Sequence, residues 1–265
     1  MHFFTSKQAR RNAHPPTFGA DLRPALSAVR GDAYAPAPMV VGLAFLATAV
    51  ATVFAQAMLV RYTRDHRAAE RAWTTALALF ALASAALATG VSTGWDNGTF
   101  RVFYLLGAVL SVPWLALGTV HLLARPTIGR RVELGLVFFS GLAAGVLLSA
   151  PMTTVHGTSI PVGKDVFGVF PRVLAAAGSG LGATVILVGA IVSAVRFARA
   201  RSVAGNGRRA LANVLIALGT LLLSSGGLIQ GVAGKDEAFV LTLAVGITII
   251  YAGFLCAAAH PVAEG

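Results

Sequence analysis

Long uncharged apolar runs, separated by short basic clusters, dominate the sequence from residue 39 onward. A bilayer core about 30 Å thick needs about 20 apolar helical residues to cross it. Since the runs are continuous and lack the alternation of barrel strands, each is expected to be a helix that satisfies its own backbone hydrogen bonds in lipid. The predicted fold class is an all-α integral membrane protein with a seven-transmembrane helix bundle. Its expected helices span residues 39–60, 73–92, 101–124, 132–152, 171–195, 210–231 and 238–259.

The composition excludes an ordinary soluble domain. Apolar residues make up 56% of the chain and charged residues only 12%, whereas a soluble domain carries about 25% charged residues. The net charge of +11 does not indicate nucleic-acid binding, because the arginines lie at the ends of apolar runs, where they set topology and contact lipid head groups. The expected partner is the lipid bilayer, and no nucleic acid is expected. The abundance of Ala, Val, Gly and Arg is typical of a bacterial protein.

Residues 1–38 are polar, basic and proline-containing, and a disordered tail is predicted for them. Met39 stands directly before the first apolar run, so the tail either belongs to the native protein or precedes its true start. The transmembrane domain is expected at 39–260. Its first, third and fifth connections carry twelve arginines, against four basic residues in the others. Basic residues mark cytoplasmic loops, which predicts a multi-pass protein of the cell (cytoplasmic) membrane with its N-terminus outside and its C-terminus inside.

An internal repeat relates the first three apolar segments to the last three. Val60-Arg61-Tyr62-Thr63-Arg64 resembles Val195-Arg196-Phe197-Ala198-Arg199, and the segment Gly90–Asp96 resembles Gly231–Asp236. Gly107 and His121 correspond to Gly246 and His260, and the offset stays between 135 and 141 residues. An odd number of spans separates the halves, so the prediction is a parallel 3+1+3 repeat with halves at 39–124 and 171–260 and a linker helix at 132–152.

This layout resembles that of the SWEET and PQ-loop transporters and, more loosely, that of the seven-helix rhodopsins. The chain contains no Pro-Gln dipeptide, and its seventh segment has no lysine for a retinal Schiff base. The resemblance is therefore one of layout alone.

The sequence does not favour catalysis. No HExxH occurs, and every Asp, Glu, Lys and Arg lies at a segment end or in a connection, which disfavours an ion-coupled pump. His121 and His260 could be axial or metal ligands, but anchoring at the membrane interface is the favoured reading. We expect no enzyme, no cofactor and no metal site.

Two polar features suggest a cavity or gate. Asp96 and Asp236, as repeat mates at the outer mouth, either form a polar gate with nearby basic residues or cap the helices that follow them. Within the third segment, Pro113 removes a helical hydrogen bond and is expected to free the carbonyl of Val109. Trp114 is expected to pack between helices, whereas Trp95 at a helix end is expected to anchor in the interfacial belt. The full candidate set is Trp95, Asp96, Arg101, Tyr104, Pro113, Trp114, Gln56, Gln230, Asp236 and Tyr251.

Small residues recur at GxxxG spacing in three segments: Gly141 with Gly145, Gly178 with Gly182, and Gly227 with Gly231. This spacing allows helices to approach closely and offers a possible homo-oligomer face. The favoured function is a small transporter or facilitator for an uncharged or weakly polar solute. The alternative is a seven-helix sensor or receptor-like protein that binds a small apolar ligand and acts through a separate partner.

Overall fold

The computed structural model describes residues 38–199, 206–233 and 235–258. Residues 1–37 of the expected tail lie outside the described residues, as does His260 of the expected histidine pair.

The described chain is almost entirely helical. α4, the π-helix η1 and α5 follow one another without a break and form one span, Asn97–Leu123. The elements are α2 (Pro38–Asp65), α3 (Ala68–Thr93), α4 (Asn97–Phe103), η1 (Tyr104–Ser111), α5 (Val112–Leu123), α6 (Pro126–Ser149), α7 (Gly163–Val166), α8 (Val169–Arg199), α9 (Asn206–Ala233) and α10 (Asp236–Ala258).

Six helical spans are long and apolar enough to cross a membrane: α2, α3, the span α4–η1–α5, α6, α8 and α10. In α9 the corresponding apolar section, Leu211–Gly227, is shorter. The expectation of an all-α, multi-pass membrane protein is therefore confirmed. A seventh crossing and the 3+1+3 repeat stay predictions.

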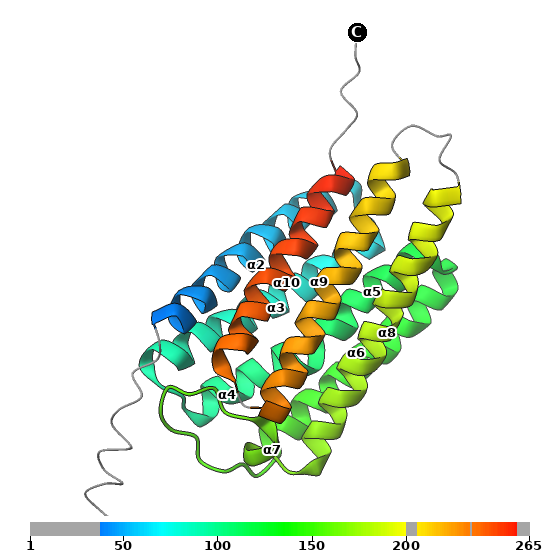
Figure 1. Ribbon diagram of the computed structural model, residues 1–265. Helices are drawn as coiled ribbons and strands as arrows, with labels where there is room; N and C mark the ends of the chain where they lie inside the picture. The colour runs from blue at the N-terminus through cyan, green and yellow to red at the C-terminus, as the bar shows by residue number, and fades with distance from the viewer. Residues whose placement is uncertain (1–37, 200–205, 234, 259–265) are drawn as a thin grey trace, which may run out of the picture. The chain divides into compact units, whose positions relative to one another are not determined.

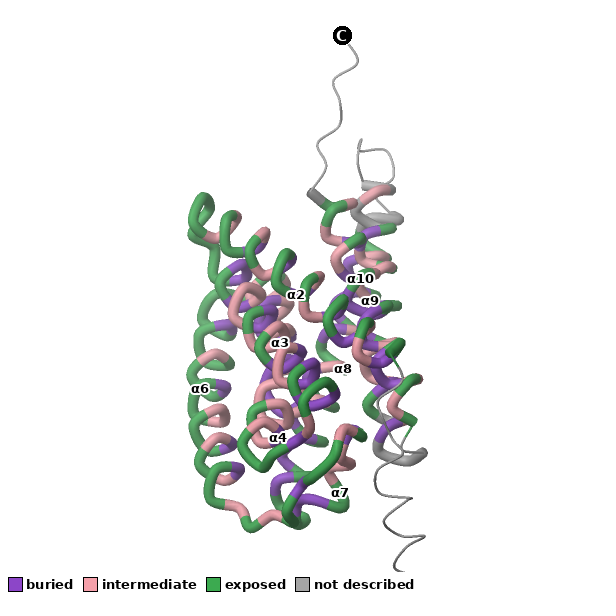
Figure 2. The backbone as a smooth tube through the Cα atoms, turned by 90° about the vertical axis from the view of Figure 1, so that its left-hand side faces the viewer, coloured by how far each residue is buried: buried purple, intermediate pink, exposed green. Residues whose placement is uncertain are grey.

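The helices follow one another around a ring in chain order (Figure 1). α2 packs on α3, α3 on α5, α5 on α8, α8 on α9 and α9 on α10, and α10 returns to α2. α6 packs outside this ring, against α5 and η1. Figure 2 shows α6 with buried residues on one side and exposed residues on the other. The exposed side carries large apolar residues such as Leu134, Phe138 and Leu148, and an apolar surface of this kind suits lipid rather than water.

α5 and α8 approach closely because α8 presents glycines to the start of α5. A Cβ at Gly178 would lie 3.0 Å from the carbonyl oxygen of Val109, and one at Gly182 would lie 3.0 Å from the nitrogen of Pro113. Gly178 and Gly182, the GxxxG pair of α8, therefore allow α8 to pack directly on the backbone of the third span. The pair on α6, Gly141 and Gly145, instead faces open space, and a role for it in an oligomer stays a prediction.

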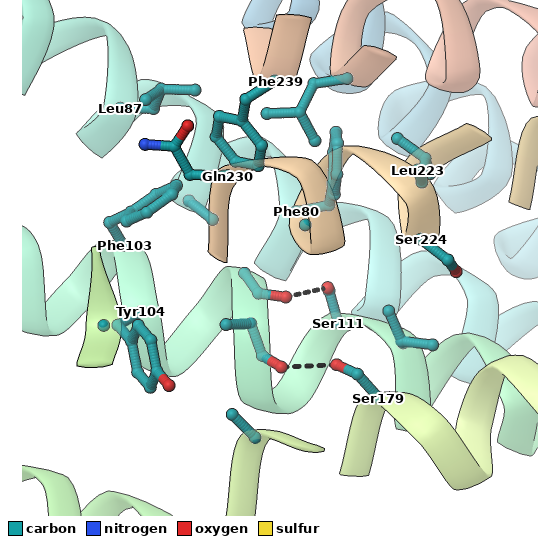
Figure 3. A pocket seen from close by; sticks show the side chains of 18 of the residues that line it. Phe80, Leu87, Phe103, Tyr104, Ser111, Ser179, Leu223, Ser224, Gln230 and Phe239 are labelled. Atoms are coloured by element: carbon teal, nitrogen blue, oxygen red, sulfur yellow. Dashed lines mark hydrogen bonds between the residues drawn. The ribbon is translucent and has the colours of Figure 1, made fainter. Parts of the chain in front are cut away.

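Pro113 was expected to free the carbonyl of Val109, but it follows directly on a π-helix, Tyr104–Ser111. In a π-helix each amide bonds to the carbonyl five residues earlier. Counted in this way, the amide that Pro113 lacks would have served the carbonyl of Ala108. The Ser179 hydroxyl of α8 donates to it at 2.5 Å, and the Ser111 hydroxyl donates to the Gly107 carbonyl at 2.8 Å (Figure 3).

The hydroxyl of Ser179 thus replaces the amide that Pro113 lacks, and the two positions should be energetically coupled. Ser179→Ala should lower the stability of the otherwise native protein by about 1 kcal/mol. The loss should be much smaller in a Pro113→Ala background, because the restored amide can bond within its own helix. Thermal unfolding of the four proteins in detergent measures this coupling as a double-mutant cycle.

Thr184→Ala is the matched control, because Thr184 is an exposed residue of α8 that donates to its own helix, at the Gly180 carbonyl, over 2.8 Å. An equal loss from Ser179→Ala in both backgrounds would contradict the assignment.

Candidate functional site

A cavity of about 760 Å³ lies among the helices of the ring. It is lined by α3, η1, α5, α8, α9 and α10 and by the connection between α6 and α8. Its walls are mainly apolar, with Phe80, Leu87, Phe103, Leu223 and Phe239 among the side chains around it (Figure 3). Small-molecule sites in proteins span about 300–1,000 Å³ and are mostly apolar. Volume and lining together indicate a site for a small molecule.

The cavity occupies one part of the bundle's length. On α8 the lining runs from Arg172 to Ala183, and on α10 from Phe239 to Ile250. Each stretch begins near the start of its helix and covers about eleven residue-to-residue rises, which correspond to about 17 Å of helix length. At the level of the last lining residues α9 and α10 pack closely: a Cβ at Gly219 of α9 would lie 2.7 Å from the Gly246 carbonyl oxygen of α10. The cavity therefore extends from near the helix starts to the level of this contact.

Three of the hydroxyl groups in the wall donate to backbone carbonyls. Besides the bonds of Ser111 and Ser179, Thr220 donates to the Ile216 carbonyl at 2.8 Å. A hydroxyl whose hydrogen is used in this way offers only lone pairs to a ligand. Among the lining residues the only charged side chains are Lys164 and Arg172. The wall is weakly polar along its length and cationic at one end.

The connection between α6 and α8, residues 150–168, reaches this cationic end and is termed the cover loop. Figure 1 shows it with α7 at the end of the bundle where α4 lies, and its residues 160–164 line the cavity. The Arg101 guanidinium donates to the carbonyl of Ala150 at 2.8 Å and also bonds to the carbonyl of Leu147. The Asn97 side-chain oxygen accepts from the Val155 amide at 3.0 Å. The span α4–η1–α5 therefore anchors the first part of the loop.

A second anchor joins the cover loop to α9 and α10. The Asp236 carboxylate accepts from the Ile160 amide at 2.8 Å and from the Gln230 side-chain amide at 3.0 Å. Gln230 Nε2 also donates to the Ile160 carbonyl at 3.1 Å. Gln230 is buried, and its Oε1 has no hydrogen-bond partner within the described part of the chain. Asp236, Gln230 and Ile160 form a latch on the loop.

Tyr104 contributes to the cavity wall and to the seat of the cover loop. It lines the cavity, and a Cβ at Gly163 would lie 2.5 Å from its ring. Its ring centroid is 5.1 Å from that of Phe167 in the same loop. Gly163 is needed at this position, because any larger side chain would meet the tyrosine.

Asp96 and Asp236, which the predicted repeat would pair, have separate roles. Asp96 caps α4, accepting from the amides of Gly98 at 2.7 Å and Thr99 at 3.0 Å and from the Thr99 hydroxyl. These bonds, led by the Thr99 hydroxyl, lower the pKa of Asp96. The cap therefore stabilises the fold above the unfolded-state pKa, and its contribution is lost as the pH falls through the lower folded-state pKa. Asp236 is the first residue of α10, and its carboxylate binds the cover loop.

The other candidate residues lie away from the cavity wall. Trp95 was expected in the interfacial belt, but it is 4% exposed and packs on Gly90, where a Cβ would lie 2.4 Å from the indole. Trp114 donates to the Ser140 hydroxyl of α6 at 3.1 Å. Gln56 is exposed on α2, and Tyr251 packs 5.0 Å from Phe54 between ring centroids.

Pro113 packs on the glycines of α8, and Arg101 binds the cover loop. Of the ten candidates, Tyr104 and Gln230 line the cavity, and Arg101 and Asp236 hold the loop beside it. A further contact comes from Trp95, whose backbone amide donates to the Gly157 carbonyl of the loop at 2.8 Å.

Sequence reasoning missed Ser179, Lys164 and Arg172 as site residues. The length of the connection at 150–168 was the available signal, since links between packed helices usually have 2–8 residues. Ser179 had no such signal, because a single serine in an apolar helix gives no indication that its hydroxyl donates to a carbonyl of another span.

His121 belongs to a polar cluster far from the cover loop. Its Nε2 lies 3.2 Å from a Glu133 carboxylate oxygen, and Arg71 bonds to the same carboxylate. No group of three or more His, Cys, Asp or Glu side chains suited to a metal occurs among the residues that the structure describes.

No model of a known protein family matches the sequence, and neither curated proteins nor solved structures give a match.

The latch predicts that Asp236→Ala will loosen the cover loop and expose the cavity. A cysteine introduced by Ser224→Cys, at a lining position, should then react about tenfold faster with a charged, water-soluble thiol reagent, since hydrogen bonds to a charged group contribute roughly 1.5–3 kcal/mol. The reaction is followed in a Cys256→Ser background, because Cys256 is the one native cysteine. Asp96→Ala is the control, since it removes a carboxylate that bonds only within α4. Equal labelling rates in the two variants would argue against the latch.

Proposed function

We propose that this polytopic membrane protein has a non-catalytic role: it binds a small, largely apolar solute in the central cavity and carries it across the membrane. The observation that carries the proposal is the cavity itself, which is apolar, large enough for a small molecule and surrounded by helices that suit a bilayer. Transfer of a solute from water into the cavity is favoured by about 25 cal/mol for each Å² of apolar surface buried.

The wall supports facilitated rather than ion-coupled transport. No Asp or Glu is among the described residues that line the cavity, and coupling to protons or cations usually uses such groups within the membrane. The hydroxyls of Ser111, Ser179 and Thr220 can accept weak hydrogen bonds from a solute. An uncharged or weakly polar body fits these surroundings.

The order of helices around the cavity supports two halves that can move against each other. α2, α3 and α5 follow one another around one part of the ring, and α8, α9 and α10 around the other. In each half the third span contacts the second at a glycine: Gly107 lies near Ala83, and Gly246 near Leu223. Parallel repeats that rock about a shared site are a known route to alternating access. We place the cover loop on the outer face of the cell membrane, following the distribution of arginines.

The close packing of α9 on α10 beside the cavity favours a second candidate, a sensor or receptor-like protein. A ligand beside the contact of Gly219 with Gly246 can act on the packing of these two helices without crossing the membrane. Binding would then shift the helices and act through a separate partner.

Filling the cavity tests the transport proposal. Gly180 and Gly227 line the cavity, and a Cβ at either position meets no atom within 4 Å. Gly180→Phe and Gly227→Phe should each reduce solute flux into proteoliposomes by about tenfold or more, because an aromatic ring takes up space that the solute needs. Flux is measured with a panel of small apolar and weakly polar solutes.

Gly145→Phe is the matched control, since Gly145 also meets no atom within 4 Å but is exposed on α6, away from the cavity. Flux that survives in the cavity variants, or falls equally in the control, would count against transport through this cavity. Binding without flux would favour the sensor.

A further inference from the structure

We infer that the ligand of the cavity is an amphiphile with an anionic head group and an apolar body. This inference rests on the proposed binding function and adds the chemical class of the ligand. The head group would lie at the cover-loop end, beside Lys164 and Arg172, and the body would extend along the apolar walls.

The two cations converge on the same end of the cavity from different elements. Lys164 belongs to α7 in the cover loop, and Arg172 to the first turns of α8. Tyr104 connects them: its ring packs on Gly163, the neighbour of Lys164, and the Arg172 guanidinium acts on it electrostatically. The start of α8 adds the positive end of a helix dipole there.

Neither cation has an ion-pair partner among the residues that the structure describes. Within the described residues the ion pairs are those of Arg61 with Glu70, and of Arg71 and His121 with Glu133. The acidic residue next to Lys164, Asp165, is not among the lining residues. Asp236, the nearest acid of the latch, already accepts from Ile160 and Gln230. An anionic ligand would supply the missing negative charge.

The remainder of the cavity is unsuited to charge. Beyond the cover loop most of its lining side chains are small or apolar, and the hydroxyls of Ser179 and Thr220 already donate to carbonyls. Its depth of about 17 Å accommodates an extended apolar body. A polar head and an apolar body would thus each find matching surroundings, whereas a cation at the head position would be repelled by Lys164 and Arg172.

Competition binding with the full-length protein tests this inference. The protein is placed in nanodiscs of zwitterionic phospholipid, and a fluorescent single-chain fatty acid serves as the probe. A sixteen-carbon carboxylate should displace the probe at about tenfold lower concentration than the alcohol of equal chain length, since hydrogen bonds to charged groups are stronger than neutral ones. The matching trimethylammonium compound should be weakest.

The double variant Lys164→Gln/Arg172→Gln should lose the preference for the carboxylate and keep its affinity for the alcohol, which also shows that it is folded. Lys235→Gln is the control, because Lys235 is an exposed lysine near the start of α10 that does not line the cavity. The control should keep the preference.

The outcomes separate the two proposals. Equal affinity for carboxylate and alcohol, or a preference that survives in the double variant, overturns the anionic head and leaves cavity binding intact. If none of the three sixteen-carbon compounds binds, cavity binding is overturned as well. Displacement by an anionic two-chain phospholipid added to the nanodiscs would identify the bilayer as the source of the head group, and displacement by the fatty acid alone would identify a free amphiphile.

Discussion

A backbone carbonyl inside a bilayer needs a donor, because lipid supplies none. In the third span Pro113 removes the amide that would serve the Ala108 carbonyl, and the Ser179 hydroxyl of α8 takes its place. The same region is a π-helix, and π-bulges often occur at functional sites. Gly178 and Gly182 allow α8 to come close enough for this bond. One proline thus sets the contact between α5 and α8, and that contact forms part of the cavity wall.

The cover loop links the cavity to polar residues of the third span and of α9 and α10. Arg101 holds it from the third span, and Asp236 with Gln230 holds it from α9 and α10. Polar side chains that first resemble a gate are here the supports of a loop. Two of the latch bonds are to the Asp236 carboxylate, and bonds to a charged group contribute about 1.5–3 kcal/mol each, whereas the neutral bond from Gln230 to Ile160 contributes about 0.5–1.5 kcal/mol.

Hydrophobic length predicted the helices well, because the bilayer imposes a strict minimum on each crossing. The N-cap at Asp96 was also within reach, as one of two alternatives, since capping depends on residues adjacent in sequence. The cavity was only partly predictable. Tyr104 and Gln230 stand out as polar residues in apolar runs, but Gln56 stands out equally and is exposed on α2. Which face of a helix meets a neighbour depends on contacts between distant segments, and sequence pattern does not carry that information.

Photo-crosslinking with an uncharged, photoactivatable long-chain alcohol tests the central claim, a ligand site within the ring of helices, most directly. If the cavity binds such molecules, labelling of the segments around Gly180 and Ser224 saturates at low probe concentration and is suppressed by unlabelled alcohol. Labelling of the lipid-facing side of α6 near Leu148 rises without saturation. If all labelled segments respond alike, and none saturates, the cavity is not a ligand site.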